Sequence, residues 1–299
     1  MVVLLARMTR VTIRLTYRPL LRMGTAQAFL WRHRRTLKVA VVRALFVFAL
    51  AWARIVKGVC MKSFIAEDSF WELFPQAAVG VVVVKGMKPA AQIPQEDVDA
   101  IAALLDRANI DAERHLTSDT ISENAPVKAW REAYRLFKTK KGARCSIENL
   151  LKRVLKGKPV GHITPAVDIY NTVSLTYALP VGGEDLHAIE GDLRLAVTDG
   201  GDAFLPLGEE TDDPTLPGEL AYIDDAGAVC RCWNWRDGVR TALSDDSADA
   251  FLAIECVEPE RMGDCQAAID RLADLLERYL GATVVAKTLV TRDNPRVEL

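Results

Sequence analysis

The chain has 299 residues and a formal net charge of −2, and half of its residues are hydrophobic, enough for one large domain or two small ones with a buried core. The charge is uneven: residues 1–60 contain twelve Lys or Arg and no Asp or Glu, so the remainder has 26 basic and 40 acidic side chains, a net charge of −14. An acidic body excludes broad binding to nucleic acid, DNA included, because such binding needs many cations against phosphates, but it allows a local basic face.

Residues 1–60 form a basic segment without turn signals, and three interpretations of it stay open. We expect a start placed too far upstream of Met61, which makes the segment a spurious or unstructured extension. The alternatives are a membrane-surface or targeting helix and a transmembrane anchor, although the apolar run 39–53 is shorter than the roughly 20 residues that a span needs. We therefore expect one domain over residues 61–299, a cytoplasmic location and no membrane partner.

Six scattered cysteines are expected to be reduced thiols, and Cys230 and Cys232 should share one face of a strand. No second Cys/His pair stands at zinc spacing, and no P-loop or dinucleotide glycine motif is present. We expect neither a metal nor a cofactor.

In chain order, the β-branched run Val79–Val84 predicts a buried strand, and Pro94 opens a helix with Val98, Ile101 and Leu105 on one face. A second helix follows Asn124, with Trp130, Tyr134 and Phe137 on its apolar stripe. Ser146 is expected to cap a third helix that reaches Leu155.

These two last helices and their linker concentrate positive charge in a short window. We expect this window to contact RNA, with a merely solvated face or structural salt bridges, for example from Arg131 to a carboxylate of the sheet, as alternatives. The candidate RNA-binding residues are Lys128, Arg131, Arg135, Lys138, Lys140, Lys141, Arg144 and Arg153, with Lys152 beside them.

A fourth helix begins near Pro165, and Pro180 with Gly182-Gly183 is expected to end it. At spacing i, i+3, its polar side chains Asp168, Asn171 and Ser174 share a face that suits binding of a carbonyl, an amino group or a water. The alternative is that these groups cap loops and satisfy buried backbone. Backbone amides of Gly182 and Gly183 suit an oxyanion or a carbonyl oxygen, and Asp185 is a candidate general base.

The rest of the chain is β-rich until a closing helix from Gln266 to Leu280 and a final strand around 284–289. Strands are expected at 193–197, 203–206, 219–223, 228–233 and 250–257. Strand alternation would place Trp233 and Trp235 on one face and Asn234 and Arg236 on the other, where the latter two suit an amide, carboxylate or phosphate. The order predicts an α+β fold with N-terminal helices and a largely antiparallel sheet.

Four blocks carry a resemblance to a known family. They are AWREAYRLF at 129–137, SIENLLKRVLKG at 146–157, VDIYNTVSLTYALPVGGEDL at 167–186 and CRCWNWRDGVRT at 230–241. Together they resemble the B3/B4 domain of the phenylalanyl-tRNA synthetase beta subunit, and most of all free-standing B3/B4 proteins.

The resemblance implies a B3/B4-like domain that recognises tRNA or aminoacyl-tRNA and hydrolyses a mischarged ester. Asp168 and Asn171 match the Asp and Asn of the synthetase's editing site. The synthetase's histidine is absent after Pro180, and Gly238-Val239-Arg240 aligns with its Gly-Gly-Glu-Glu loop, so its tyrosine-recognition chemistry is not carried over. The alternatives are a non-catalytic tRNA- or RNA-binding module and an amino-acid or small-molecule binding protein.

Overall fold

The computed structural model describes residues 62–299, and these form an α+β domain. Its helices are α3 (Asp68–Leu73), α4 (Gln95–Asp111), α5 (Ala125–Ala133), α6 (Ser146–Leu155), α7 (Pro165–Tyr177) and α8 (Met262–Leu280). Its strands are β1 (Ser63–Ala66), β2 (Ala78–Lys85), β3 (Val181–Asp185), β4 (Leu193–Val197), β5 (Leu220–Asp224), β6 (Gly227–Arg231), β7 (Arg236–Asp237), β8 (Ala250–Cys256), β9 (Thr283–Val290) and β10 (Arg296–Glu298).

The strands form two sheets. The central sheet has the order β3-β8-β2-β9 and is antiparallel throughout, while the second sheet has the order β10-β1-β4-β5-β6-β7 with one parallel pair, β1 and β4. The sequence predicted a largely antiparallel sheet after the helices. The fold class is confirmed, but β1 and β2 precede most helices and the strands divide between two sheets.

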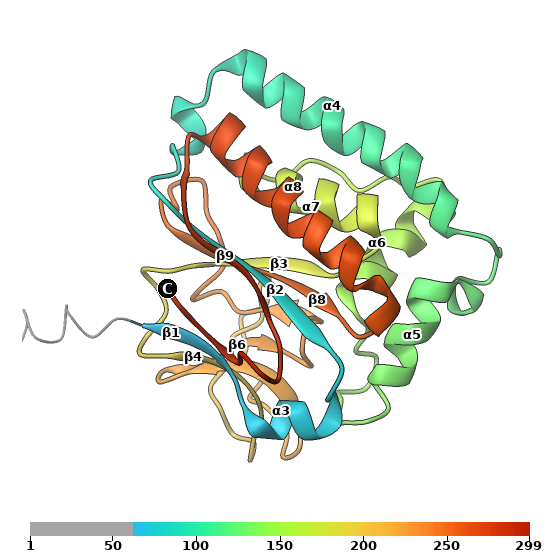
Figure 1. Cartoon of the computed structure of the whole chain (residues 1–299), viewed down its shortest axis with the longest axis vertical. Helices are drawn as coiled ribbons and strands as arrows, with labels where there is room; N and C mark the ends of the chain where they lie inside the picture. Colours follow the sequence, from blue (N-terminus) through green and yellow to red (C-terminus); the bar gives the residue numbers. More distant parts are fainter. Residues whose placement is uncertain (1–61) are drawn as a thin grey trace, which may run out of the picture. The chain divides into compact units, whose positions relative to one another are not determined.

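The central sheet lies between the second sheet and a layer of helices (Figure 1). Its strand β2 has successive residues buried on opposite faces: Val79, Val81 and Val83 contact the core shared with the second sheet, and Val82 and Val84 contact the helical side. Burial on both faces explains why β2 is a continuous apolar run rather than an alternating one.

Helices α7 and α8 pack on the central sheet, and α4 packs outside α7 (Figure 1). Helix α8 approaches β2 closely because residue 80 is glycine: a Cβ there would lie 2.7 Å from Cγ1 of Ile269. The apolar stripes predicted for α4 and α8 are confirmed, with Ile101, Leu105 and Leu272 buried. Gly281, at φ 63°, ends α8 in the left-handed conformation that glycine favours.

Three local predictions were wrong. Gly182 and Gly183 do not end a helix but lie inside β3, because β8 supplies hydrogen-bonding partners for an extended backbone there. Residues 203–206 form no strand, only the bridge between Pro206 and Gly238. Ser146 is the first residue of α6 and Cys145 is its N-cap, with no side-chain capping bond.

The expectations for residues 1–60, and for Cys60, lie outside the described residues. Within 62–299, no helix combines the length and the apolar character needed to cross a bilayer. The five cysteines of this range are unpaired and buried. Cys230 lies in β6 but Cys232 follows the strand, so the expected shared strand face was wrong.

Candidate functional site

A cavity of about 80 Å³ lies where the two sheets face each other beside the N-terminus of α6. Strands β3 and β8 form one wall, and β5, β6, β7 and the β6–β7 connection form the other. The lining residues are Ser146, Val181, Gly182, Gly183, Glu184, Tyr222, Cys230, Trp233, Asn234, Trp235, Asp237, Phe251, Ala253 and Glu255.

Strand register decides which side chains of β3 face this cavity. Gly182 pairs with Ala253 and Glu184 pairs with Phe251, so these residues share the face of the central sheet that meets the second sheet. A Cβ on Gly182 would meet nothing within 4 Å. The missing side chain therefore leaves open space in the cavity wall.

Buried polar atoms without a hydrogen-bond partner concentrate around the cavity. Among the described residues seven side-chain atoms are in this state, and five belong to cavity-lining residues: Ser146 Oγ, Glu184 Oε2, Trp233 Nε1, Asn234 Nδ2 and Glu255 Oε2. Each such atom costs about 1–3 kcal/mol when left unpaired, so native proteins tolerate few of them. The cluster leaves donors and acceptors in one cavity that a small polar ligand or water could pair.

Three carboxyl groups line the cavity, and the pKa of each is raised. Burial raises the pKa of Glu255 to about 8, and Tyr222, which donates a hydrogen bond to Glu255 Oε1 at 2.8 Å, opposes part of this effect. Burial, and after it the negative charge of Asp237, raises the pKa of Glu184 well above its usual value. Burial also raises the pKa of Asp237. Within the described range, no Lys, Arg or His lines the cavity to neutralise these groups.

The β6–β7 connection supplies the aromatic wall in an unusual backbone conformation. Cys232 and Trp233 have φ angles of 46° and 64°, a left-handed region that costs non-glycine residues energy and is common at functional sites. The turn ends β6 at Arg231, so the predicted alternation of Trp233 and Trp235 along one strand was wrong. The indole of Trp233 is fully buried, with ring centroids 4.8 Å from both Phe74 and Trp130.

A buried ion pair holds this connection in place. Arg231 donates to both carboxylate oxygens of Glu219, at 2.9 and 2.6 Å, and both side chains are inaccessible to solvent. Glu219 Oε1 also accepts from the backbone N–H of Cys232 at 2.9 Å. Although burial alone would raise the pKa of Glu219, the hydrogen bonds from Arg231 and the backbone hold it below the usual value.

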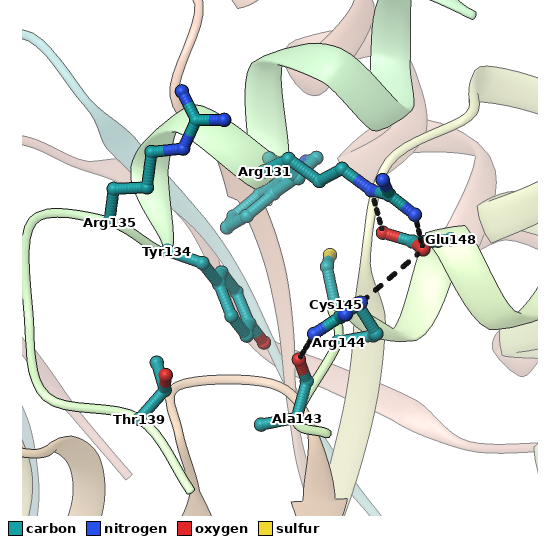
Figure 2. A pocket seen from close by; sticks show the side chains of 9 residues that line it. Arg131, Tyr134, Arg135, Thr139, Ala143, Arg144, Cys145 and Glu148 are labelled. Carbon is teal, nitrogen blue, oxygen red and sulfur yellow. Dashed lines mark hydrogen bonds and ion pairs between the residues drawn. The ribbon is translucent and has the colours of Figure 1, made fainter. Parts of the chain in front are cut away.

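A second hollow, of about 250 Å³, lies next to the cavity between α5 and the start of α6 (Figure 2). We call it the basic groove; it is lined by Trp130, Arg131, Tyr134, Arg135, Thr139, Ala143, Arg144, Cys145 and Glu148. Figure 2 shows Arg131 and Arg144 converging on Glu148 while Arg135 points away from them. Arg131 reaches Glu148 through two hydrogen bonds of 3.0 and 2.6 Å, and Arg144 Nε lies 3.7 Å from the same carboxylate.

One layer of side chains separates the groove from the cavity. Cys145 lines the groove and the next residue, Ser146, lines the cavity. Tyr134, in the groove wall, directs its hydroxyl to the carbonyl oxygen of Cys232 at 2.8 Å and to Asn234 Oδ1 at 2.9 Å. Because Oδ1 of Asn234 accepts from Tyr134, the Nδ2 donor of the amide is the atom left without a partner at the cavity.

The structure brings three predicted pocket residues, Gly182, Gly183 and Asn234, to the cavity. Asp168, Asn171 and Ser174 are buried in α7 and do not line it. The carboxylate of Asp168 accepts from the backbone N–H of Ile163 at 2.9 Å and lies 3.0 Å from Nδ1 of His162.

Ser174 donates to the carbonyl oxygen of Leu179 at 2.6 Å. Asp185 lies in β3 outside the cavity lining and accepts from Ser247 at 2.6 Å. Arg236 forms an ion pair with Glu209 at 3.0 Å and also lies outside the cavity lining.

The predicted basic residues divide into paired and unpaired groups. Arg131 and Arg144 are bound to Glu148 of α6, not to a carboxylate of the sheet as proposed for Arg131, and Lys140 forms an ion pair with Asp213. The remaining candidates form no ion pair within residues 62–299. These are Lys128, Arg135, Lys138, Lys141 and Arg153, together with Lys152; all six are exposed.

Sequence reasoning missed Ser146, Glu184, Asp237 and Glu255 as cavity residues. A signal existed for Glu255, because it is the one charged side chain in the apolar strand β8 and charged residues are almost never fully buried without a function or a partner. No group of three His, Cys, Asp or Glu residues in the described range has a geometry that could hold a metal ion.

The family model described as the B3/4 domain matches residues 129–281, just over half of the chain. Comparison with curated proteins finds no match. Among solved structures, one match is an N-terminal fragment of the phenylalanyl-tRNA synthetase beta-subunit from Pyrococcus horikoshii, with 12% sequence identity and a TM-score of 0.40. The match covers 79% of this chain and 53% of the synthetase fragment, so this chain spans about half the length of the fragment.

Proposed function

The chain belongs to the B3/4 domain family, and on that premise we propose that it recognises the aminoacylated 3′ end of a tRNA and hydrolyses the ester. The observation that carries this proposal is the cavity with five unpartnered buried polar atoms, one layer of side chains away from the basic groove. The cavity takes the aminoacyl group, and the groove takes the phosphates next to it.

The groove supplies guanidinium groups, which bind phosphate through two parallel hydrogen bonds. Arg131 and Arg144 are already oriented by Glu148, and Arg135, which forms no ion pair within residues 62–299, lies in the turn that follows α5. An RNA backbone bound along these guanidinium groups contacts cations in a domain that is otherwise acidic. Binding is therefore local and salt-dependent.

The cavity supplies groups for ester hydrolysis. The donors Asn234 Nδ2 and Trp233 Nε1 hold the carbonyl oxygen of the ester, where negative charge develops when water adds to the carbonyl carbon. The bond between that carbon and the ribose oxygen then breaks. The attacking water gives one proton to a carboxylate of the cavity, and the ribose oxygen takes up one proton, with the neighbouring ribose hydroxyl assisting. A carboxyl group whose pKa is close to neutral, such as Glu255, suits this proton transfer.

Deacylation tests the proposal directly. The full chain is incubated with a panel of tRNAs that carry different amino acids, and the released amino acid is measured. We expect release above the uncatalysed rate for at least one amino acid, and a loss of about 100-fold or more in Asn234→Ala, which removes the donor at the carbonyl oxygen. Release at the uncatalysed rate for every amino acid refutes hydrolysis.

RNA binding is tested separately by tRNA affinity as a function of salt. The double variant Arg135→Ala/Arg144→Ala, with both changes in the groove, should bind more weakly, and its salt dependence should be shallower by about two phosphate contacts. The double variant Lys85→Ala/Arg292→Ala carries the same charge change at exposed positions outside the groove and should bind like the wild type. Equal losses in both variants refute the groove as the contact. Binding without deacylation supports the non-catalytic module instead.

A further inference from the structure

We infer that the cavity selects aminoacyl groups by their free α-ammonium group and rejects both N-acylated aminoacyl groups and free amino acids. This inference names the substrate class of the cavity and therefore rests on the proposed function.

Each carboxyl group reaches the cavity from its own strand: Glu184 from β3, Asp237 from β7 and Glu255 from β8. The side chains of Glu184 and Glu255 belong to residues only 6% and 2% exposed, and in each the Oε2 atom has no hydrogen-bond partner. These two Oε2 acceptor atoms thus lie in a space that is nearly inaccessible to water. The side chains of Thr241 and Asn234 lie close enough to lower the pKa of Glu184 and of Glu255, respectively, but neither forms a hydrogen bond with the Oε2 atom.

The polar atoms of the cavity divide into two chemical kinds. Glu184 Oε2 and Glu255 Oε2 are acceptors, whereas Trp233 Nε1 and Asn234 Nδ2 are donors. An aminoacyl ester carries the complementary pair, because its α-ammonium group donates and its carbonyl oxygen accepts. The Ser146 hydroxyl can take either role, and the phenol of Tyr222 is occupied by Glu255.

The electrostatics favour a cation at the acceptor side. The carboxyl groups resist ionisation when the cavity is empty, as their raised pKa values express, and within the described range no basic side chain lines the cavity. An ammonium group supplies both the positive charge that favours ionised carboxylates and the N–H donors that their oxygens lack. The resulting hydrogen bonds are charge-assisted. Acetylation of the amine removes the charge and adds bulk in a cavity of about 80 Å³.

The same groups disfavour a free amino acid. Its α-carboxylate would lose its water in a buried space where no basic side chain of the described range compensates the negative charge, and the three carboxyl groups there could not ionise beside it. The ester has no carboxylate. Hydrolysis of the ester produces a carboxylate. The acidic cavity that binds the aminoacyl group should therefore bind the free amino acid product weakly.

The test uses the full chain with twenty L-amino-acid amides, the corresponding N-acetyl amides and the free amino acids, with binding measured by calorimetry. The amides present the same ammonium and carbonyl groups as the substrate. They have no ester bond, so binding is measured without hydrolysis. We expect at least one amide to bind, with an affinity about tenfold or more above that of its N-acetyl form and of the free amino acid. Glu184→Gln and Glu255→Gln should each weaken this amide by about tenfold, whereas Glu277→Gln, which removes an exposed carboxylate of α8, should not.

The outcomes separate this inference from the proposed function. Equal affinity for an amide and its N-acetyl form overturns the inference, and so does the absence of binding by every amide. Equal deacylation rates for aminoacyl-tRNA and N-acetylaminoacyl-tRNA overturn it while hydrolysis stands. Amide binding that depends on Glu184 and Glu255, with no deacylation of any tRNA, supports the inference and refutes hydrolysis. Melting temperatures of the two variants check that they fold.

Discussion

Replacement of Glu255 by glutamine should stabilise the protein, and increasingly so as the pH rises. Glu255 is 2% exposed, its Oε1 accepts from Tyr222, and its Oε2 has no partner. Glutamine keeps the shape and the Oε1 acceptor but cannot ionise. The variant therefore removes the cost of a buried charge and little else.

The magnitude follows from the difference between the folded and unfolded states. The pKa of Glu255 is about 8 in the folded protein, against an unperturbed value of 4.5. The folded state therefore binds the proton more tightly, so the contribution of Glu255 to stability is fully present below pH 4.5 and is lost as the pH rises to about 8. At about 1.4 kcal/mol for each pKa unit, the loss is on the order of 3 kcal/mol at pH 7 and 5 kcal/mol above pH 8.

The assay is urea unfolding of the wild type, Glu255→Gln and the exposed control Glu277→Gln, between pH 5 and pH 9. The difference in free energy of unfolding between Glu255→Gln and the wild type should be small at pH 5 and grow with pH. The control should follow the wild type. A difference that stays constant with pH, or a Glu255→Gln protein less stable at pH 9 than the wild type, refutes the reasoning that an unneutralised buried carboxyl group stands in this cavity.

Three further predictions concern the walls of the cavity. Tyr134→Phe should lower kcat for deacylation about tenfold with little change in KM, because the amide of Asn234 loses the bond that orients it; an unchanged kcat contradicts this role. Gly182→Val should abolish amide binding by filling open space without loss of melting temperature, whereas Gly161→Val, also in open space, should bind normally; normal binding by Gly182→Val would exclude this cavity as the site. Glu219→Gln should lower the free energy of unfolding by about 1–3 kcal/mol, because the buried guanidinium of Arg231 then keeps only Asp213 as a charged partner, and a urea midpoint like that of the wild type would contradict this.

The helices were largely predictable because their signals are local. Helical periodicity and the glycine at 281 placed α4 and α8, and the charge of residues 125–153 marked the α5–α6 region as basic. The block pattern identified the family. What the sequence did not reveal was the pairing of those charges, since the bond from Arg131 to Glu148 depends on how α5 packs on α6.

The β6–β7 connection shows where local signals fail. Residues 230–235 have the composition of a strand, yet the ion pair between Arg231 and Glu219 and the packing of Trp233 among Phe70, Phe74 and Trp130 hold a left-handed turn there. These partners are distant in sequence. Tertiary contacts therefore overrode the local preference, and they carried Asn234 into the cavity wall.

The sequence by itself determined the fold class, the family and the presence of acidic, amide and glycine residues near positions 182–185 and 234. Only the tertiary structure decided which of two adjacent carboxylates faces the cavity. Side chains alternate along a strand, so the register of β3 on β8 turns Glu184 inward and leaves Asp185 bound to Ser247. A shift of one residue would exchange them, and that register depends on hydrogen bonds to a strand about 70 residues away in sequence.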